Sequence, residues 1–599
     1  MGVVARIKRE FQFMGALQRL LKGVKGITPE GRDLVCDDFE RAVDKWPDNV
    51  AVICGDRRLT YRELDALANR YAHWAKGRGI RRGDTVALMM PNRLEYTAIW
   101  IGLSKVGVAT ALINNNLTGK GLAHCLNLSG ATHVLADGDT WQAFEDVRGL
   151  VGRSTMLWVL GLDAREETSA RRGLDTAVKG ASAVRPDRLS REDIKAASIA
   201  LYIYTSGTTG LPKAARITHA KAQLYMRAFA ATTQARPTDR LYCALPLYHS
   251  TGGLCAVGAA YLTGAALVIR KRFSAAAFWP DIVEHGCTIF VYIGELCRYL
   301  VNQPEHPQET QHKVRLAFGN GLRPEIWPEF QKRFRIPEIL EFYGSTEGNV
   351  SLFNFDGKPG AIGRIPRWMR NQFNIRLVKF DLDIGEPMRD ARGLCIEARP
   401  GEIGEAIGEI APDPKHHFAG YADKAASEKK ILRDVFKPGD QFFRTGDLMR
   451  QDDAGYLYFV DRIGDTYRWK GENVSTTEVS ERLGSLPGVE EVVVYGVPVP
   501  RAEGKAGMAA IVAGEGFDIE ALKGHVDHDL PDYAQPVFVR LSRGMETTGT
   551  MKYTKTGLVA DGFDPPNSKD KVYYRHPEKG YVRLDKRALT KLQAGELKL

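Results

Sequence analysis

The sequence has few cysteines and no arrangement of them that suits a metal. Eight cysteines are spread over 599 residues, no two form a Cys-x-x-Cys pair, and none has zinc-type spacing to a histidine. Such spacings are the usual sequence signature of structural zinc, and dense cysteines mark small disulfide-stabilised domains. We therefore predict reduced thiols in a cytoplasmic protein without a metal cluster.

An apolar run long enough to cross a membrane is also lacking. Residues 241–269 contain no Asp, Glu, Lys or Arg, but 246–253 has the glycine-rich, polar composition of a loop. The apolar remainder, 254–269, is shorter than the roughly 20 residues that a transmembrane helix needs. We predict a buried helix followed by a strand in this region.

We expect no secretory signal at the N-terminus. Residues 1–27 mix basic with apolar side chains, and no apolar stretch of signal type follows the basic ones. Helical spacing gathers much of the apolar set on one face, so the segment 1–35 is predicted to contain a basic amphipathic helix. Two interpretations stay open: peripheral contact with an anionic membrane at the inner face of the cell membrane, or docking on the protein body.

Acidic residues are outnumbered by basic ones. The 83 Lys and Arg against 73 Asp and Glu give a formal net charge of +10. This excess suits anionic partners such as nucleotides, coenzyme A or acidic lipid headgroups, although a merely soluble basic surface explains it equally well. We predict no binding of nucleic acid.

Short apolar runs alternate with helix-like stretches through the first half of the chain. Residues 49–54 and 84–90 have the composition of strands, whereas 61–76 and 94–107 have that of helices. Strand–helix alternation predicts an α/β fold with mainly parallel sheets. From residue 404 the strand-like segments come closer together, which predicts a β-rich subdomain.

The length predicts more than one domain. We place a large N-terminal domain at 36–461, with the β-rich subdomain at its end. A small, mobile α+β C-terminal domain is predicted at 462–565, and a basic C-terminal tail at 566–599.

The strongest local signal is a loop rich in hydroxyl groups and glycine that directly follows a predicted strand. Hydroxyls donate to phosphate oxygens, glycines let the backbone approach them, and a lysine adds positive charge. It is not a Walker loop, because Leu211 and Pro212 separate the last glycine from the lysine. A solvated turn is the alternative, which four hydroxyls, two glycines and a lysine within ten residues disfavour. The predicted phosphate-binding residues are Tyr204, Thr205, Ser206, Gly207, Thr208, Thr209, Gly210 and Lys213.

Three later motifs join this loop to give a pattern that resembles the adenylate-forming superfamily, which includes acyl-CoA synthetases and firefly luciferase. They are EFYGSTE at 341–347, FRTGDL at 443–448 and DRIGD at 461–465. Their order and spacing match the family over roughly residues 38–560. Longer stretches look like its fatty acid transport protein and very-long-chain acyl-CoA synthetase branch: 292–300, 434–440 and 468–479.

The resemblance implies an ATP-dependent ligase that joins a long-chain fatty acid to coenzyme A through an acyl-adenylate. Such a protein mainly aligns two anions and neutralises charge. Glu347 and Thr205 would hold Mg²⁺, Thr346 would contact the α-phosphate, and His249 would border the acyl carboxylate. The other residues implied to bind nucleotide or coenzyme A are Gly319, Asn320, Gly321, Tyr343, Gly344, Ser345, Asp447, Tyr458, Arg462, Lys470, Gly471 and Glu472.

The resemblance also implies a lysine near the C-terminus that bridges the carboxylate and the α-phosphate. The candidate region is 547–555, where Thr550 and Met551 interrupt the usual Gly-Lys pair. We predict Lys552 for this role and keep Lys555 in reserve. The motif at 461–465 is predicted to be a hinge about which the C-terminal domain rotates between the two half-reactions.

Several alternatives remain open at this point. Asn320 fits a plain turn equally well, and a lone histidine such as His249 is often a packed structural residue. A fatty acid uptake protein that traps the acid as its thioester is one alternative function, and a ligase that loads a carrier protein is another. Acyl chain length is not set by the sequence, and neither is the choice between monomer and homodimer.

Overall fold

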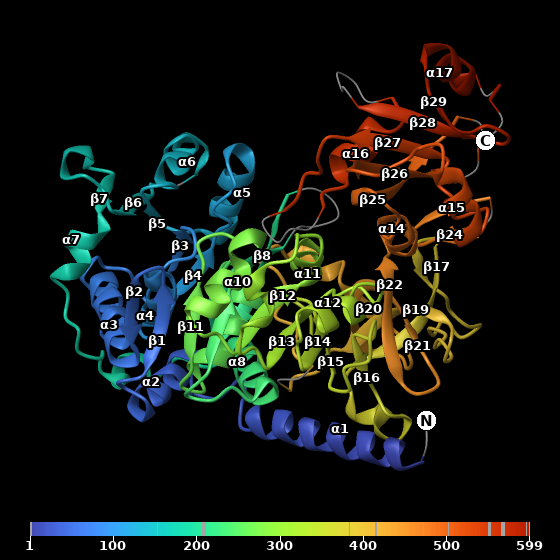
Figure 1. Ribbon diagram of the computed structural model, residues 1–599. Helices are drawn as coiled ribbons and strands as arrows, with labels where there is room; N and C mark the ends of the chain where they lie inside the picture. Colours follow the sequence, from blue (N-terminus) through green and yellow to red (C-terminus); the bar gives the residue numbers. More distant parts are fainter. Residues whose placement is uncertain are drawn as a thin grey trace. The chain divides into compact units, whose positions relative to one another are not determined.

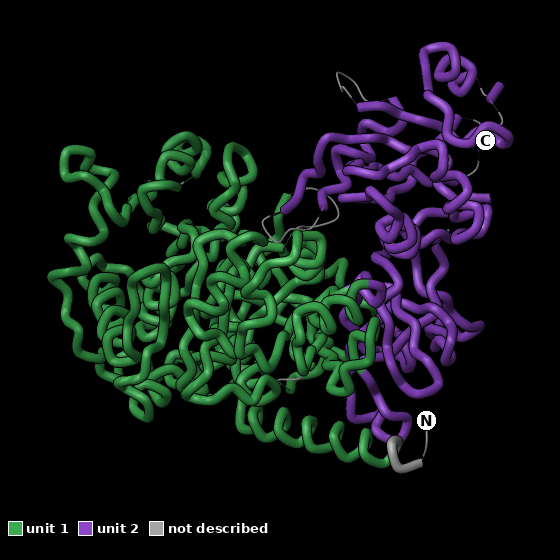
Figure 2. Tube along the Cα trace, in the orientation of Figure 1, with its two compact units in different colours: residues 1–322, 326–363, 409–432 green, residues 323–325, 364–408, 433–599 purple. Residues whose placement is uncertain are grey.

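The chain folds into two compact units (Figure 2). The first consists of residues 1–322, 326–363 and 409–432, and the second of 323–325, 364–408 and 433–599. The structure is a computed structural model, and it describes residues 3–152, 154–205, 211–382, 384–413, 416–470, 472–500, 502, 504–548, 553–564, 570–594 and 596–597.

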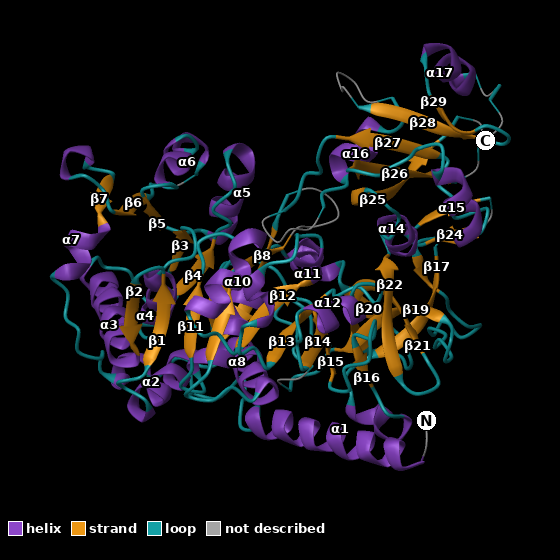
Figure 3. Cartoon of the chain, in the orientation of Figure 1, coloured by secondary structure: helices purple, strands orange, loops and turns teal. Residues whose placement is uncertain are grey.

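An eight-stranded sheet forms one layer of the first unit (Figure 3). Its edge pairs β14–β15 and β1–β2 are antiparallel and its other pairs are parallel. The strands in spatial order are β15 (Ser351–Asn354), β14 (Glu338–Gly344), β13 (Leu316–Asn320), β12 (Ile289–Ile293), β10 (Arg240–Cys243), β11 (Ala266–Ile269), β1 (Val50–Cys54) and β2 (Arg57–Thr60).

A seven-stranded sheet forms a second layer of this unit. Its pairs are parallel except for the terminal hairpin β8–β9. In spatial order the strands are β7 (Arg171–Gly173), β6 (Met156–Leu160), β5 (His133–Asp137), β3 (Thr85–Met89), β4 (Ala109–Leu112), β8 (Ile199–Thr205) and β9 (Lys213–Thr218).

Helix α4 (Leu94–Ser104) is the centre of the first unit's core. It is mostly apolar and buried along its whole length, and its one charged residue, Glu95, pairs with Arg57 and Arg93. It packs closely on α3 (Tyr61–Gly77), because a Cβ at Gly102 would lie 2.2 Å from the carbonyl oxygen of Ala68. The other helices of the unit are α1 (Val3–Gly23), α2 (Val35–Lys45), α5 (Gly119–Ser129), α6 (Trp141–Glu145), α7 (Leu174–Lys179), α8 (His219–Thr233), α9 (Val257–Tyr261), α10 (Ala275–Glu284), α11 (Gly294–Val301), α12 (Trp327–Arg333) and α13 (Lys424–Glu428).

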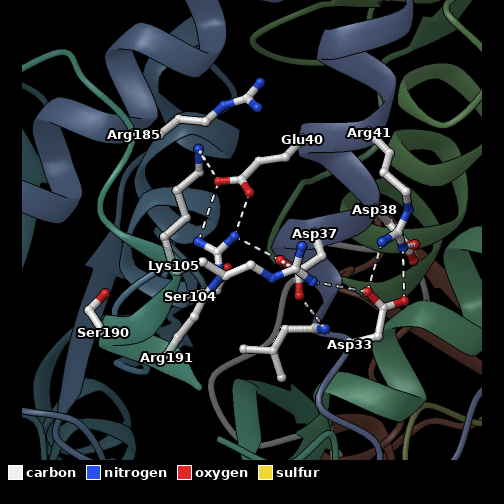
Figure 4. A network of polar contacts seen from close by, with 12 residues as sticks. Asp33, Asp37, Asp38, Glu40, Arg41, Ser104, Lys105, Arg185, Ser190 and Arg191 are labelled. Carbon is white, nitrogen blue, oxygen red and sulfur yellow. Dashed lines mark hydrogen bonds and ion pairs between the residues drawn. The ribbon is translucent and has the colours of Figure 1, made fainter. Parts of the chain in front are cut away.

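Buried ion pairs tie α2 to the rest of this core (Figure 4). Lys105, at the end of α4, is fully buried and pairs with Glu40 at 2.9 Å and with Asp65 at 2.6 Å. Arg191 pairs with Glu40 and, at 2.7 Å, with Asp37. Removing one partner of such a network leaves an unpaired buried charge, which typically costs about 3–5 kcal/mol. The network therefore fixes the N-terminal part of the first unit.

Helix α1 packs along α8 at the surface of the first unit (Figure 1). Phe13, Ala16 and Leu17 are buried, and Phe13 meets Phe355 edge to face with ring centroids 5.9 Å apart. The N-terminal segment is therefore helical and docked on the protein body. Among the described residues, no helix combines the length and the apolar character needed to cross a bilayer.

The second unit contains the β-rich subdomain that the sequence predicts. Its neighbouring strands are β22 (Tyr456–Arg462), β21 (Gln441–Gln451), β19 (Ile403–Glu409), β17 (Arg376–Asp381) and β18 (Glu386–Pro387). The pairs β21–β22, β17–β19 and β17–β18 are antiparallel. Two short strands, β16 (Gly363–Arg364) and β20 (Ile431–Arg433), lie where the chain passes between units.

The rest of the second unit is an α+β assembly around a five-stranded sheet. The strands in order are β25 (Val489–Pro498), β26 (Lys505–Ala513), β27 (Phe538–Ser542), β28 (Lys571–His576) and β29 (Gly580–Arg583). A hairpin of β23 (Tyr467–Trp469) and β24 (Glu472–Val474) accompanies four helices: α14 (Thr476–Gly484), α15 (Leu522–Asp529), α16 (Thr556–Asp561) and α17 (Lys586–Gln593). The predicted fold class, parallel α/β sheets with a β-rich subdomain and a small α+β domain, is thus confirmed.

The region predicted as a basic C-terminal tail contains regular secondary structure. Residues 571–583 form β28 and β29 of the C-terminal sheet, and α17 follows them. Val572, Tyr574 and Tyr581 are buried, while the intervening charged residues are wholly or partly exposed. Lys571, Arg575 and Arg583 lie on the antiparallel pair β28–β29 of a mixed sheet, and each is wholly or partly exposed.

Candidate functional site

The predicted phosphate loop joins two paired strands of the first unit. β8 leads into it and β9 leaves it, so Thr205 and Lys213 are register partners at its two ends. The side chain of Tyr204 is buried, and its hydroxyl donates to the carbonyl of Cys125 at 2.7 Å. Ser206, Gly207, Thr208, Thr209 and Gly210 lie outside the described residues.

Two further predicted segments meet at the other sheet of this unit. Parallel strands β13 and β14 lie side by side, with Gly319 opposite Glu341. Residues 319–321 lie at the carboxyl end of β13 and just beyond it. Residues 343–347 lie in the same way at the carboxyl end of β14, so both segments are at the same edge of the sheet. The carboxyl ends of parallel strands are where open α/β sheets bind their ligands.

Glu347 and Lys213, predicted from separate motifs, both lie near one tyrosine. The hydroxyl of Tyr421 donates to Glu347 Oε1 at 2.6 Å, and Lys213 Nζ lies 5.7 Å from the centre of its ring. Burial and the Glu347 carboxylate raise the pKa of Tyr421, and an interaction with the Thr205 hydroxyl partly offsets this rise. The structure therefore brings together a carboxylate, an ammonium group and a hydroxyl.

Thr346 adjoins the segment that carries His249. Its hydroxyl shares a hydrogen bond of 3.1 Å with that of Ser250. The rings of Tyr248 and His249 are 4.6 Å apart between centroids. The residue predicted to contact the α-phosphate is thus brought close to the turn predicted to border the acyl carboxylate.

Helix α8 holds the 345–348 turn through two side chains one helical turn apart. The Tyr225 hydroxyl donates to the carbonyl of Ser345, and Lys221 Nζ donates to that of Gly348, both at 2.8 Å. Burial lowers the pKa of Lys221 to about 8, although the Glu347 carboxylate acts in the opposite direction. These two contacts fix both ends of the turn that contains Thr346 and Glu347.

Sequence reasoning missed Tyr421, Lys221 and Tyr225. Tyr421 lies 74 residues beyond Glu347, and no motif marks it. Lys221 and Tyr225 lie within an ordinary helix. The one available signal is their i, i+4 spacing, which puts both on one face of α8.

In the second unit, Asp447 and Arg462 are register partners on β21 and β22. Arg462 Nε lies 3.7 Å from Asp447 Oδ1. Tyr458, on the same strand as Arg462, donates from its hydroxyl to Asp452 at 3.1 Å. The structure therefore brings two of these three predicted nucleotide-binding residues into contact and engages the third elsewhere.

The predicted hinge is tied to helix α14. Asp461 is buried and accepts from the backbone N–H of Thr476 at 2.6 Å, and burial raises its pKa. Lys555, the reserve lysine, donates to Thr476 Oγ1 at 2.8 Å and lies 3.2 Å from Asp465. Lys552 lies outside the described residues.

Lys470 and Glu472 flank the turn between β23 and β24. Both side chains are exposed. Lys470 has a φ of 51°, in the left-handed region that non-glycine residues rarely adopt. Gly471 lies outside the described residues.

Comparison with known proteins agrees with this arrangement of motifs. The family model for AMP-binding enzymes matches residues 39–393, and that for the AMP-binding enzyme C-terminal domain matches 478–552. Long-chain fatty acid transport protein 1 of Mus musculus is 41% identical over 567 residues, covering 94% of this chain and 88% of that protein. Long-chain fatty acid transport protein 3 of Homo sapiens is 42% identical over 530 residues, covering 86% and 76%.

Solved structures show the same fold at lower identity. The ATP-bound MatB of Rhodopseudomonas palustris superimposes with a TM-score of 0.73 at 24% identity, covering 88% of this chain and 98% of that one. The fatty acyl CoA synthetase of Mycobacterium tuberculosis gives a TM-score of 0.61 at 24% identity, covering 89% and 99%.

Proposed function

Because this chain belongs to the AMP-binding enzymes and, within them, to the family of long-chain fatty acid transport proteins, we propose that it is a long-chain fatty acid–CoA ligase. The fatty acid carboxylate attacks the α-phosphorus of ATP, which forms an acyl-adenylate and releases pyrophosphate. The thiol of coenzyme A then attacks the acyl carbon, and AMP leaves with the bonding electron pair.

The observation that best supports this proposal is the meeting of Lys213, Glu347 and Thr205 at Tyr421. Lys213 would neutralise the phosphate tail of ATP together with the loop 206–210. A carboxylate and a hydroxyl are oxygen ligands that fit Mg²⁺, so Glu347 and Thr205 would hold that ion. When bound, Mg²⁺ would supply further charge neutralisation of the triphosphate.

The remaining predicted residues take the roles that the family assigns. Thr346 would contact the α-phosphate and His249 the acyl carboxylate, while Lys552 would bridge the two groups. Asp447 and Arg462 would face the ribose. The adenine pocket would be lined by Gly319, Asn320, Gly321, Tyr343, Gly344 and Ser345, and the coenzyme A stage would use Lys470, Gly471 and Glu472.

A pyrophosphate-release assay with fatty acids of graded chain length tests the proposal. We expect acid-dependent release of pyrophosphate from ATP, and acyl-CoA formation only when coenzyme A is added. Purified protein should make the thioester without a membrane, which separates catalysis from translocation. Replacing coenzyme A by a carrier protein should give no acylated product. Acylation of the carrier protein instead of coenzyme A would favour the carrier-loading ligase.

Uptake of fatty acids is compatible with the same chemistry. The relatives are named as transport proteins. A ligase at the inner face of a membrane would trap an incoming acid as its charged thioester. Vectorial acylation of this kind needs no activity other than the ligase.

We expect Gly464→Pro, in the predicted hinge, to impair thioester formation about tenfold while leaving adenylation near the parental rate. Proline fixes φ and removes the freedom that a rotation about 461–465 needs. Adenylation is measured as acid-dependent exchange between pyrophosphate and ATP, and thioester formation with pre-made acyl-adenylate. Gly464→Ala, which keeps the backbone amide, is the control. Equal loss of both half-reactions would contradict the hinge.

We further propose a cytoplasmic protein whose helix α1 makes peripheral contact with an anionic membrane. Away from its buried residues, α1 exposes Ile7, Phe11 and Leu21, and Phe11 is 74% exposed. Lys8 and Lys22 are exposed beside them. A helix with apolar and basic residues on one outer surface suits the headgroup region of anionic lipids.

Phe11→Ser together with Leu21→Ser is expected to lower binding to phosphatidylserine-containing vesicles at least about fivefold, because both side chains would enter the interface. Co-sedimentation with vesicles measures this binding, and phosphatidylcholine vesicles should bind weakly throughout. Leu189→Ser removes an equally apolar, 71% exposed side chain elsewhere and should have no effect. Parental binding by the double variant would exclude this surface.

A further inference from the structure

We propose that Glu341 is a positioning residue that holds the loop 319–322 in the shape needed to select adenine. This inference rests on the proposed function, in which residues 319–321 line the adenine pocket. Glu341 lies on β14, six residues before Glu347, and is 2% exposed. It belongs to none of the groups that would touch ATP, Mg²⁺ or the acyl chain.

The carboxylate of Glu341 binds the loop directly. Its Oε1 accepts hydrogen bonds from the backbone N–H groups of Gly321 and Leu322, the latter at 3.1 Å. Its Oε2 accepts from the hydroxyl of Tyr292 at the end of β12. One buried carboxylate therefore ties the loop after β13 to the two neighbouring strands.

The loop is held equally closely at its other side. Asn320 is the register partner of Ile293, so pairing with β12 fixes the chain on the N-terminal side of Asn320. A Cβ at Gly294 would lie 1.6 Å from the carbonyl oxygen of Gly321, so the start of α11 touches the loop backbone. Gly321 itself has a φ of 81°, which glycine adopts readily. Asn320 is thus fixed on both sides, with Glu341 holding the C-terminal one.

Two of the three donors that Glu341 satisfies belong to the loop. Burial raises the pKa of Glu341 to about 8, in spite of the hydrogen bonds that it accepts. The cost of burying this ionisable group is offset because its carboxyl group is the acceptor for the Tyr292 hydroxyl and for two backbone N–H groups of the loop. The benefit is a rigid loop, because purines are distinguished by hydrogen bonds to donors and acceptors whose positions do not adapt.

Direct binding of AMP tests the inference without relying on catalysis. We expect Glu341→Ala to raise the Kd for AMP about tenfold in calorimetry, and to lower the preference for AMP over GMP by a similar factor. Glu341→Gln should stay within about threefold of the parent, because its amide oxygen still accepts from both backbone N–H groups. Glu341→Asp keeps the carboxyl group but shortens the side chain, so it should lose selectivity even if the alanine variant does not fold.

Asn354 provides the matched control. It is the register partner of Glu341 on β15, is 1% exposed, and donates to the carbonyls of Lys358 and Ala361. Asn354→Ala should lower the melting temperature while leaving AMP binding and purine selectivity at parental values. The inference is overturned if folded Glu341→Ala and Glu341→Asp keep parental selectivity, or if Asn354→Ala loses as much. Failure of the parent to bind AMP would instead refute the proposed function.

Discussion

Fatty-acid-dependent release of pyrophosphate is expected to fall at least about a thousandfold when Lys213 and Glu347 are both replaced by alanine. Transfer at phosphorus depends on neutralising charge around the phosphates, and loss of one preorganised electrostatic group typically costs about 10²–10³ in rate. The two side chains come from motifs far apart in the sequence but meet at Tyr421. Their loss would remove the lysine charge and the predicted Mg²⁺ carboxylate together.

The control removes the same two residue types from the surface. Lys195 and Glu30 form an exposed ion pair in the same unit. The control variant Lys195→Ala with Glu30→Ala keeps the parental net charge, as the test variant does. Because exposed pairs contribute about 0–1 kcal/mol to stability, this control should keep its parental rate. Circular dichroism verifies that both variants fold. If the Lys213→Ala, Glu347→Ala variant releases pyrophosphate at the parental rate with its best fatty acid, the proposed function is wrong.

Several strands of the two sheets of the first unit could be predicted from the sequence because their signals are local. Apolar runs at 49–54 and 84–90 correspond to β1 and β3, and the strand before the phosphate loop is β8. The adjacency of 319–321 and 343–347 follows from parallel pairing of β13 and β14, which strand–helix alternation makes the default.

The contacts that position the site could not be predicted in this way. Tyr421, Lys221 and Glu341 act through hydrogen bonds to residues 19 to 127 positions away, several of them to backbone atoms that have no sequence signature. Periodicity identifies which face of an element is buried, but it does not identify the partner across the interface. Side chains that support a motif from another element are therefore identified only from the structure.

The C-terminal region shows how little of its secondary structure the sequence indicates. Its lysines and arginines predicted a basic tail without naming any strand, and the structure contains β28 and β29 there. Tyr573 and Tyr574 lie between charged residues in KVYYRH, so the alternation is too short to stand out from the overall charge. β28 lies between β27 and β29, and its charged residues alternate with the buried Val572 and Tyr574.

Lys552→Ala is expected to lower adenylation about a hundredfold or more, whereas Lys555→Ala should stay within about threefold of the parent. A cation between the carboxylate and the α-phosphate stabilises charge that develops in the transition state. Loss of one such preorganised group typically lowers the rate by about 10²–10³. Lys555 is instead engaged within the second unit, by Thr476 at 2.8 Å and Asp465 at 3.2 Å. Its ammonium group is thus held at the start of α14, beside the predicted hinge.

Separate assays of the half-reactions distinguish the two lysines. Lys552→Ala should lose acid-dependent exchange between pyrophosphate and ATP but still convert supplied acyl-adenylate and coenzyme A into thioester, since that step does not need the bridging cation. Lys555→Met, which keeps the length of the side chain without its charge, should behave as Lys555→Ala does. If Lys555→Ala abolishes exchange and Lys552→Ala does not, the contacts at Thr476 and Asp465 must break during adenylation, and the bridging role passes to Lys555.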